Sequence, residues 1–181
     1  ETRLREKAPD RALEAAQLLS ATNREPTWRQ IGLALSGDAR LALGRAEEAR
    51  ADYRAATALG AATPAEARAW MKLGDLALAE SAFTDAETAY GEAVRRAGES
   101  DRVRALATAG LARALEGQGN WAGAARFYMN VALLYQEPAL TPECYFKAAE
   151  MFRKQGRSRE AEELRAELRK QFPGSPWASK E

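Results

Sequence analysis

The sequence of 181 residues contains no histidine and a single cysteine, Cys144. Histidine is the usual general base near neutral pH and the commonest metal ligand, so its absence also removes every Ser-His and Cys-His nucleophile arrangement. One cysteine forms neither an internal disulfide nor a cysteine metal cluster, and we interpret Cys144 as a buried thiol. Glycine-rich phosphate loops of the GxxxxGK or GxGxxG type are absent too. The sequence therefore predicts a protein that is not an enzyme and needs no cofactor or metal.

Charge of one sign and long apolar runs are also scarce. The chain has 27 Lys plus Arg against 26 Asp plus Glu, and no basic run exceeds a pair. This balance gives little of the electrostatic attraction on which nucleic acid binding depends. The longest uncharged stretches, 55–65 and 127–136, are about ten residues each, whereas a membrane span requires about 20. We therefore expect no nucleic acid partner and no membrane span.

The sequence repeats itself with a period of 37 to 38 residues. A shift of 37 places Leu35–Ala56 over Lys72–Ala93, with identical residues at Gly37 and Gly74, Asp38 and Asp75, Ala49 and Ala86, Tyr53 and Tyr90, and Ala56 and Ala93. Further shifts of 38 and 37 reach Ala124, Tyr128 and Val131, and then Ala161, Arg165 and Leu168. A fixed period of this length is the signature of a repeat architecture. We infer four copies of one unit.

Each unit is predicted to contain two helices, because apolar residues recur at intervals of three and four. The predicted helices span 27–43, 46–59, 64–80, 84–97, 101–117, 121–135, 142–154 and 158–171. Capping boxes are expected at Thr63–Glu66 and Thr84–Glu87. Positive φ angles are expected in the turns at Gly44, Ser81, Gly119 and Gly156.

Small and aromatic residues at equivalent positions predict how the helices pack. Gly37, Gly74, Ala112 and Ala149 on the first helices should face Ala49, Ala86, Ala124 and Ala161 on the second helices. Such small residues allow a close approach of the helix axes. The tyrosines four residues further along should fill the remaining space and reach the neighbouring unit, namely Tyr53, Tyr90 and Tyr128.

These residues resemble the tetratricopeptide repeat. The second unit carries its pattern most fully, with Trp70, Leu73 and Gly74 followed by Ala86, Tyr90 and Ala93. The resemblance covers about 27–173, although the period is longer than the usual 34 residues and the fourth unit replaces the aromatic residue with Arg165. It implies an all-α fold, a right-handed α-solenoid of helix-turn-helix repeats. The longer joints and the ending 168–178 are similar to bacterial extracytoplasmic repeats, such as those of the Tol-Pal associated periplasmic protein and the outer-membrane assembly lipoproteins. This second resemblance favours a periplasmic or cell-envelope location over a cytoplasmic one.

The expected organisation is a row of units. Residues 1–26 form an N-terminal helix that matches the second half of a preceding repeat, and 27–62, 63–99, 100–140 and 141–174 form repeats 1 to 4. Residues 175–181 begin a further helix or form a tail. Both ends thus look cut from a longer array. Trp177 is either covered by further sequence or a partner, or it folds back on the last helix pair.

The resemblance also implies a concave groove lined by the first helices. It would bind an extended peptide or a helix through apolar residues, with charged residues that fix its register. The groove residues implied in this way are Asp38, Arg68, Met71, Asp75, Leu78, Arg113, Glu116, Phe146, Glu150 and Arg153. The paired lysines and asparagines of a clamp for a C-terminal carboxylate are absent, so that ligand class is rejected. The other interpretation is a set of solvated helix faces with intramolecular ion pairs.

The second helix of the third unit is apolar nearly all round. Met129 and Leu133 lie where the other units carry arginine, lysine, glycine or alanine. A surface helix should show only one apolar stripe. We therefore expect these two residues to be covered by the 136–142 joint, by the N-terminal helix or by another chain, the last of which would make a homodimer.

The function predicted is a non-enzymatic scaffold that binds a protein or peptide partner in the groove. The alternative is a ligand-binding or catalytic accessory domain that encloses a small polar molecule, which would need a deep pocket with convergent, perturbed titratable groups. Acidic pairs such as Glu47-Glu48 and Glu162-Glu163 are interpreted as solvated charge, because adjacent helical residues point about 100° apart. Helical-repeat RNA binding is a weak third reading, since successive groove positions are mostly acidic.

Overall fold

The computed structural model describes residues 8–135 and 137–180, and its regular elements in these ranges are all helical. They are α2 (Ala8–Thr22), α3 (Pro26–Ala42), α4 (Ala46–Ala58), α5 (Pro64–Ala79), α6 (Phe83–Arg96), α7 (Asp101–Gly117), α8 (Trp121–Asn130), η1 (Val131–Tyr135), α9 (Thr141–Lys154) and α10 (Ser158–Gln171). The all-α prediction is confirmed for this part of the chain.

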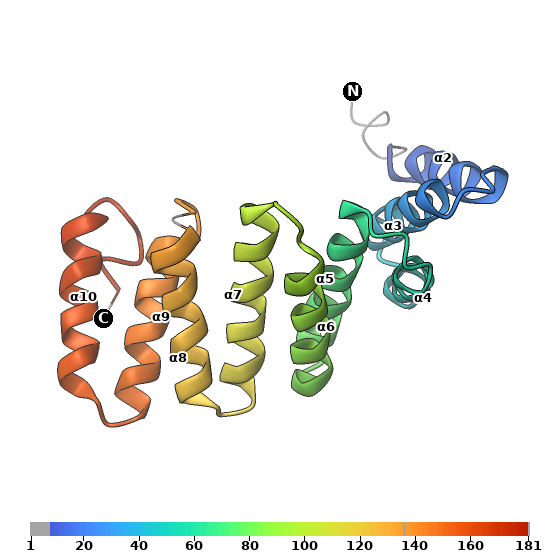
Figure 1. Ribbon diagram of the computed structural model, residues 1–181. Helices are drawn as coiled ribbons and strands as arrows, with labels where there is room; N and C mark the ends of the chain where they lie inside the picture. The colour runs from blue at the N-terminus through green and yellow to red at the C-terminus, as the bar shows by residue number, and fades with distance from the viewer. Residues whose placement is uncertain (1–7, 136, 181) are drawn as a thin grey trace.

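The helices form a single row that runs from α2 at one end to α10 at the other (Figure 1). Each helix packs on the next one along the chain, and α5 also contacts both α3 and α7. Contacts confined to near neighbours are typical of a solenoid. Figure 1 shows α7 to α10 from the side but α3 and α4 more nearly along their axes, so the row twists from end to end.

The bounds of the helices from α3 onward agree with the prediction to within a residue or two, except in the third unit. Of the N-terminal segment 1–26, the structure describes α2 at Ala8–Thr22. In the third unit α8 ends at Asn130, and Val131–Tyr135 forms a π-helix, which closes wider turns than an α-helix. A segment that is apolar on almost every side carries no periodicity that distinguishes the two over a single turn. The prediction of one α-helix over 121–135 is therefore wrong at its C-terminal end.

Both predicted capping boxes are also wrong. Thr63 caps α5, since its side chain accepts a hydrogen bond from the Ala65 amide. Glu66 does not complete the box, because it is buried and accepts a hydrogen bond of 2.5 Å from Arg96 Nε. The second box fails because α6 begins one residue earlier than expected, at Phe83.

The turns that end the first helices have the expected backbone. Gly44, Gly119 and Gly156 have φ angles of 75°, 77° and 76°, and Ser81 takes their place with a φ of 58°. Only glycine adopts this left-handed region without a steric cost. The four equivalent turns give each helix pair a similar reversal of direction.

Tyrosine rings fill the space between the two helices of a unit. Tyr53 and Tyr90 are almost fully buried. A Cβ atom placed on Gly37 would lie 2.6 Å from the Tyr53 ring, and one on Gly74 would lie 2.9 Å from the Tyr90 ring. The Tyr90 ring also contacts Gly110 of the next unit. The prediction that a tyrosine reaches the neighbouring unit is thus confirmed for Tyr90, and the glycines are required by the rings.

Candidate functional site

Tyrosine hydroxyls on the second helices hold carboxylates on the first helices. Tyr53 donates a hydrogen bond of 2.7 Å to Asp38 Oδ1, and Tyr90 donates one of 2.7 Å to Asp75 Oδ1. In the third unit Arg113 occupies the aspartate position. Tyr128 there donates to Glu116 Oε2 at 2.7 Å instead. Each bond joins the two helices of one unit.

The fourth unit keeps this arrangement although its tyrosine is replaced. Arg165 on α10 donates to Glu150 Oε1 on α9 at 2.9 Å. The guanidinium group thus takes over the role of the hydroxyl, as a charged donor in place of a neutral one. The sequence shows the loss of the aromatic residue at this position but not that the contact survives.

A cation binds the second oxygen of each of these four carboxylates. Asp38 Oδ2 pairs with Arg68 at 2.7 Å, and Glu116 Oε1 pairs with Lys147 at 3.1 Å. Both of these pairs cross from one unit to the next. The other two stay within a unit and are Lys72 with Asp75 at 3.3 Å and Arg153 with Glu150 at 2.8 Å.

The structure therefore brings six of the predicted groove residues into linked pairs on the first helices, namely Asp38, Arg68, Asp75, Glu116, Glu150 and Arg153. Sequence analysis missed their partners Lys72, Lys147 and Arg165. The spacing of Lys72 and Asp75, three residues apart on one helix, was the available signal for the first of these. The other two depend on contacts between helices, which one sequence does not show.

Burial is the main cause of a raised pKa at each tyrosine of these pairs. The hydrogen bond to the carboxylate and its negative charge raise the pKa further. The hydroxyls of Tyr53, Tyr90 and Tyr128 therefore remain protonated donors at every physiological pH. Burial also raises the pKa of the Cys144 thiol, to about 12, so this cysteine is an unreactive core residue.

Arg113 differs from the other arginines predicted for the groove. It is exposed, and its Nε donates only to the backbone carbonyl of Ala109 at 3.4 Å. Among the described residues no carboxylate forms an ion pair with it. Its positive charge acts on both Tyr90 and Tyr128, where it offsets a small part of the rise in pKa that burial and the carboxylates cause. Arg113 is thus a cation near two of the tyrosine–carboxylate pairs that has no ion-pair partner among the described residues.

The apolar groove residues differ in how open they are. Met71 is half-buried, and half-buried Leu78 packs against the core cluster of Ala77 and Tyr90. The Phe146 ring is covered by Trp177, with ring centroids 5.3 Å apart. The tail after α10 thus folds back on the last helix pair, as one of the two alternatives for Trp177 predicted.

The apolar residues of the third unit fall into two groups. Met129 packs against the core cluster around Tyr128, whereas Leu133 is 56% exposed and its neighbour Leu134 is 70% exposed. The π-helix turns these two leucines outward. The comparison between units singled out Met129 and Leu133 and missed Leu134.

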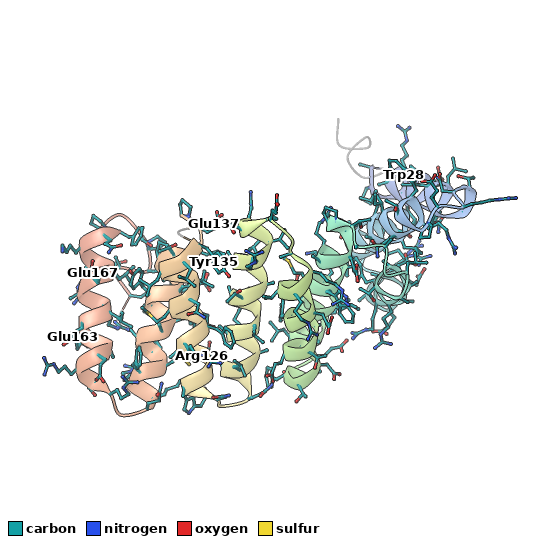
Figure 2. All side chains as sticks on the ribbon, viewed as in Figure 1. Trp28, Arg126, Tyr135, Glu137, Glu163 and Glu167 are labelled. Carbon is teal, nitrogen blue, oxygen red and sulfur yellow. The ribbon has the colours of Figure 1, made fainter. Side chains whose placement is uncertain are left out.

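One acidic residue of the pairs interpreted as solvated charge forms an exposed ion pair. Glu163 lies on α10 (Figure 2) and pairs with Arg159 at 3.0 Å, with both side chains exposed. Within 8–135 and 137–180, acidic and cysteine side chains form no group of three that could hold a metal ion. No helix in the described part of the chain is both long and apolar enough to cross a membrane.

Comparisons with known proteins agree with this geometry. A family model for the tetratricopeptide repeat matches residues 35–102. No curated protein sequence matches the chain. Among solved structures, the fold is similar to BtubC (BKLC) from P. vanneervenii, with 19% identity and a TM-score of 0.76 over 96% of this chain and 75% of that one. It is also similar to a putative kinesin light chain from Podosopora anserina with nearly identical TPR-like repeats, with 17% identity and a TM-score of 0.71 over 91% of this chain and 85% of that one.

The fold is therefore that of an all-α repeat solenoid of the tetratricopeptide type. The match to the tetratricopeptide-repeat family model, over residues 35–102, includes most of the first unit and the whole second helix pair. The neighbours share the fold at low identity, so they define the architecture and not the ligand.

Proposed function

We propose that the chain is a scaffold that binds a protein segment along its first helices, with Arg113 as the central anchor for an acidic side chain. Tetratricopeptide-repeat solenoids serve in general as protein–protein interaction scaffolds, typically without enzymatic activity. The observation that carries the proposal for this chain is the exposed, uncompensated guanidinium group of Arg113 beside carboxylates that are already satisfied.

The fixed carboxylates make this surface selective. Asp38, Asp75 and Glu116 each accept from a tyrosine and a cation, so their positions are set before a ligand binds. A preorganised site loses less side-chain entropy on binding. Arg113 can bind a carboxylate with two parallel hydrogen bonds, which are stronger than bonds between neutral groups. Met71 and Leu78 supply apolar contacts on the preceding unit.

This arrangement is different from a clamp for a chain terminus, because the predicted groove positions of the described residues present Arg113 without an ion pair in place of a pair of lysines with asparagines. It favours an internal segment with a glutamate or aspartate that faces Arg113.

Selection of peptides from a display library with the full chain tests this proposal. We expect the selected peptides to share one acidic position and to lose at least tenfold in affinity, about 1.4 kcal/mol, to Arg113→Glu. Replacing that acidic residue by lysine should restore binding to Arg113→Glu. The control is Arg126→Glu, an equal charge change at an exposed site on α8 (Figure 2). Equal losses with both variants would contradict a role for Arg113.

Self-association through the third unit is a second candidate function, favoured by the exposure of Leu133. Leu133 borders a cavity of about 400 Å³ with Pro138, Tyr145 and Phe172. Of the two residues predicted for this contact, Leu133 is available for it, whereas Met129 packs within the chain. Light scattering should show that Leu133→Asp dissociates a homodimer while helicity is retained. A wild-type chain that is monomeric at high concentration would exclude this function.

The alternative of an enclosed small polar molecule has no support among the described residues, because Cys144 and the tyrosines with a strongly raised pKa are buried by packing.

The cellular location is a separate proposal. The resemblance of 168–178 to bacterial extracytoplasmic repeats supports a periplasmic or cell-envelope site. Fractionation of the native cell with an antibody to the chain tests it, and recovery in the cytoplasm alone would exclude it.

A further inference from the structure

A pocket of about 300 Å³ lies between α4, α5 and α6, in the interior of the row. Leu73 and Ala89 are buried lining residues and form an apolar base. Arg54, Asp85 and Thr88 are exposed lining residues and form a polar rim. All the lining residues fall within 50–89, so three consecutive helices of the chain complete the walls of this pocket.

The pocket and the groove lie on different faces of α5. Trp70 lines the pocket together with residues of α4, whereas Asp75 belongs to the predicted groove and pairs with Lys72. Five residues separate Trp70 from Asp75, and at 100° per residue their side chains point about 140° apart. A ligand bound on the groove face therefore leaves the pocket open.

The repeat register shows how this joint differs from the next one along the row. A shift of 37 places Trp70 on Ala107, and a shift of 38 places Ala89 on Phe127. Ala107 is fully buried, and Phe127 packs against the core cluster around Tyr128. The large ring is thus an apolar phenyl group in the later unit. Here it is an indole, which carries a polar N–H group.

Buried donors at the pocket lack hydrogen-bond partners. Trp70 Nε1 and Arg50 Nε are both buried, and within the described residues neither donates a hydrogen bond. Glu47 Oε2 lies 3.6 Å from Arg50 Nε, which is too far for a hydrogen bond. Buried donors normally have an acceptor. Both side chains line the pocket, so an acceptor that enters it lies against them.

The rim adds a cation. Arg54 is exposed, and no carboxylate of the described residues forms an ion pair with it. Asp85 would favour a cationic occupant instead, but its exposed carboxylate is already solvated, and exposed ion pairs contribute little. An ammonium group brings only donors and cannot satisfy a buried N–H group. The unpaired donors therefore favour an occupant that carries a carboxylate.

We propose that this pocket binds the side chain of a glutamate on a protein partner. Its two methylene groups would contact Leu73 and Ala89, and its carboxylate would face Arg54 and the Trp70 N–H group. A partner's side chain is favoured over a free small carboxylate because the rim is open to solvent, where one ion pair contributes little without further contacts. The inference rests on the scaffold role proposed above but not on Arg113, and it gives the chain a second binding surface.

Selection of peptides from a display library on the full chain carrying Arg113→Glu tests this proposal, because that variant weakens binding at the groove. We expect the selected peptides to share a glutamate and to lose at least tenfold in affinity to Arg54→Glu. Asp85→Asn should raise their affinity at least twofold, since it removes a like charge from the rim. Arg126→Glu is the matched control, an equal charge change at an exposed site on α8 (Figure 2).

The indole N–H resonance of Trp70 gives a readout at the proposed donor, and Trp70→Phe assigns it by its loss. A selected peptide should shift this resonance downfield as the carboxylate accepts a hydrogen bond. The same peptide with its shared glutamate replaced by alanine should not. Circular dichroism checks that each variant is folded.

Four outcomes would overturn the proposal. The first is a selection without binders, and the second is a set of binders that Arg54→Glu leaves unchanged. The third is a set that shares a lysine or arginine and is weakened by Asp85→Asn, because the occupant would then be a cation. The fourth is competition by N-acetylglutamate α-amide at the affinity of the peptide, because the ligand would then be a free small carboxylate. Peptides that bind the wild type through Arg113 should be unaffected by Arg54→Glu, so failure at this pocket is distinguishable from failure at Arg113.

Discussion

At the scale of single residues, a buried tyrosine ring such as that of Tyr90 occupies the space where a side chain on a facing helix would otherwise lie. The Tyr90 ring lies between Gly74 of its own unit and Gly110 of the next. Any Cβ atom at these glycines meets ring atoms on a side chain that cannot move, because its hydroxyl is bonded to Asp75. The tyrosine and the glycines thus form one packing unit across a repeat boundary.

Gly110→Ala tests this packing. We expect it to lower the free energy of unfolding by about 1–3 kcal/mol through overpacking. Gly91→Ala is the control, because this glycine also lies inside a helix but a Cβ atom there has no neighbour within 4 Å. That substitution should stabilise the chain by about 0.5–1 kcal/mol, since glycine weakens a helix relative to alanine. Urea denaturation measures both, and equal effects would contradict the assignment.

The raised pKa of Tyr90 predicts a loss of stability at alkaline pH. An unfolded tyrosine loses its proton near pH 10, whereas the folded one keeps it because burial and Asp75 raise its pKa. Above pH 10 the folded state therefore holds more protons, so the free energy of unfolding falls as pH rises. We expect the slope to be about 1.4 kcal/mol per pH unit smaller in Tyr90→Phe.

Urea denaturation between pH 8 and about pH 11 measures this slope. Tyr135→Phe removes a hydroxyl outside the tyrosine–carboxylate pairs and serves as the control. The same slope in Tyr90→Phe and in the wild type would show that Tyr90 does not contribute to the alkaline loss.

At the scale of elements, the joint between α4 and α5 is held by a buried glutamine. Gln30 Nε2 donates to the Ala56 carbonyl at 3.0 Å, and its Oε1 accepts from the Thr63 hydroxyl at 2.6 Å and the Thr63 amide at 3.3 Å. One side chain of α3 thereby satisfies the end of α4 and the start of α5. Buried polar groups of a joint need such partners because water does not reach them.

Gln30→Leu should lower the free energy of unfolding by about 1–3 kcal/mol, because the buried Thr63 amide and hydroxyl would lose their acceptor and the Ala56 carbonyl would lose one of its donors. Gln17→Leu, an exposed position on α2, controls for the change in side-chain chemistry. Calorimetry measures the melting temperature of each variant and so tests the expected loss of stability. The prediction fails if Gln30→Leu melts at or above the wild-type temperature.

Local sequence patterns predict most elements but not the contacts that cross between them. The periodicity of apolar residues and the turn positions Gly44, Ser81 and Gly119 depend on near neighbours in the chain, and they are confirmed. The π-helix at Val131–Tyr135 and the pairing of Glu66 with Arg96 depend on packing between helices. A glutamate at the third helical position fits a capping box equally well until a distant arginine competes for it.

At the scale of the whole molecule, stability depends on the position of a helix in the row. Within the described residues, helices α5 to α9 have neighbours on both sides, whereas α2 packs extensively only on α3. In a linear array each unit is stabilised by its neighbours, and the ends open at a lower free energy.

Native-state hydrogen exchange should therefore show the weakest protection in α2, with protection rising toward α5 and α7. Mass spectrometry of proteolytic fragments resolves these segments. Uniform protection along the chain would indicate a single cooperative unit instead.

In the candidate site too, the sequence predicts what depends on neighbouring residues, and it does not predict contacts between distant segments. The repeat register predicts which residues lie on the first helices, and the structure shows six of these in linked ion pairs. Arg113 differs from the equivalent residues of the first two units, because it is a cation where those units carry aspartate. The coverage of Phe146 depends on where a tail of a few residues folds, which no repeat pattern specifies.

Because each carboxylate binds two partners, the charged groups of this surface lie at fixed distances from one another. Asp38 receives Tyr53 on one oxygen and Arg68 on the other, so it cannot swing to meet a misplaced charge. One added residue lengthens an extended ligand by about 3.3 Å, which is more than the length of a hydrogen bond. A ligand that contacts two units must therefore keep the number of residues between its charged side chains constant, whatever those intervening residues are.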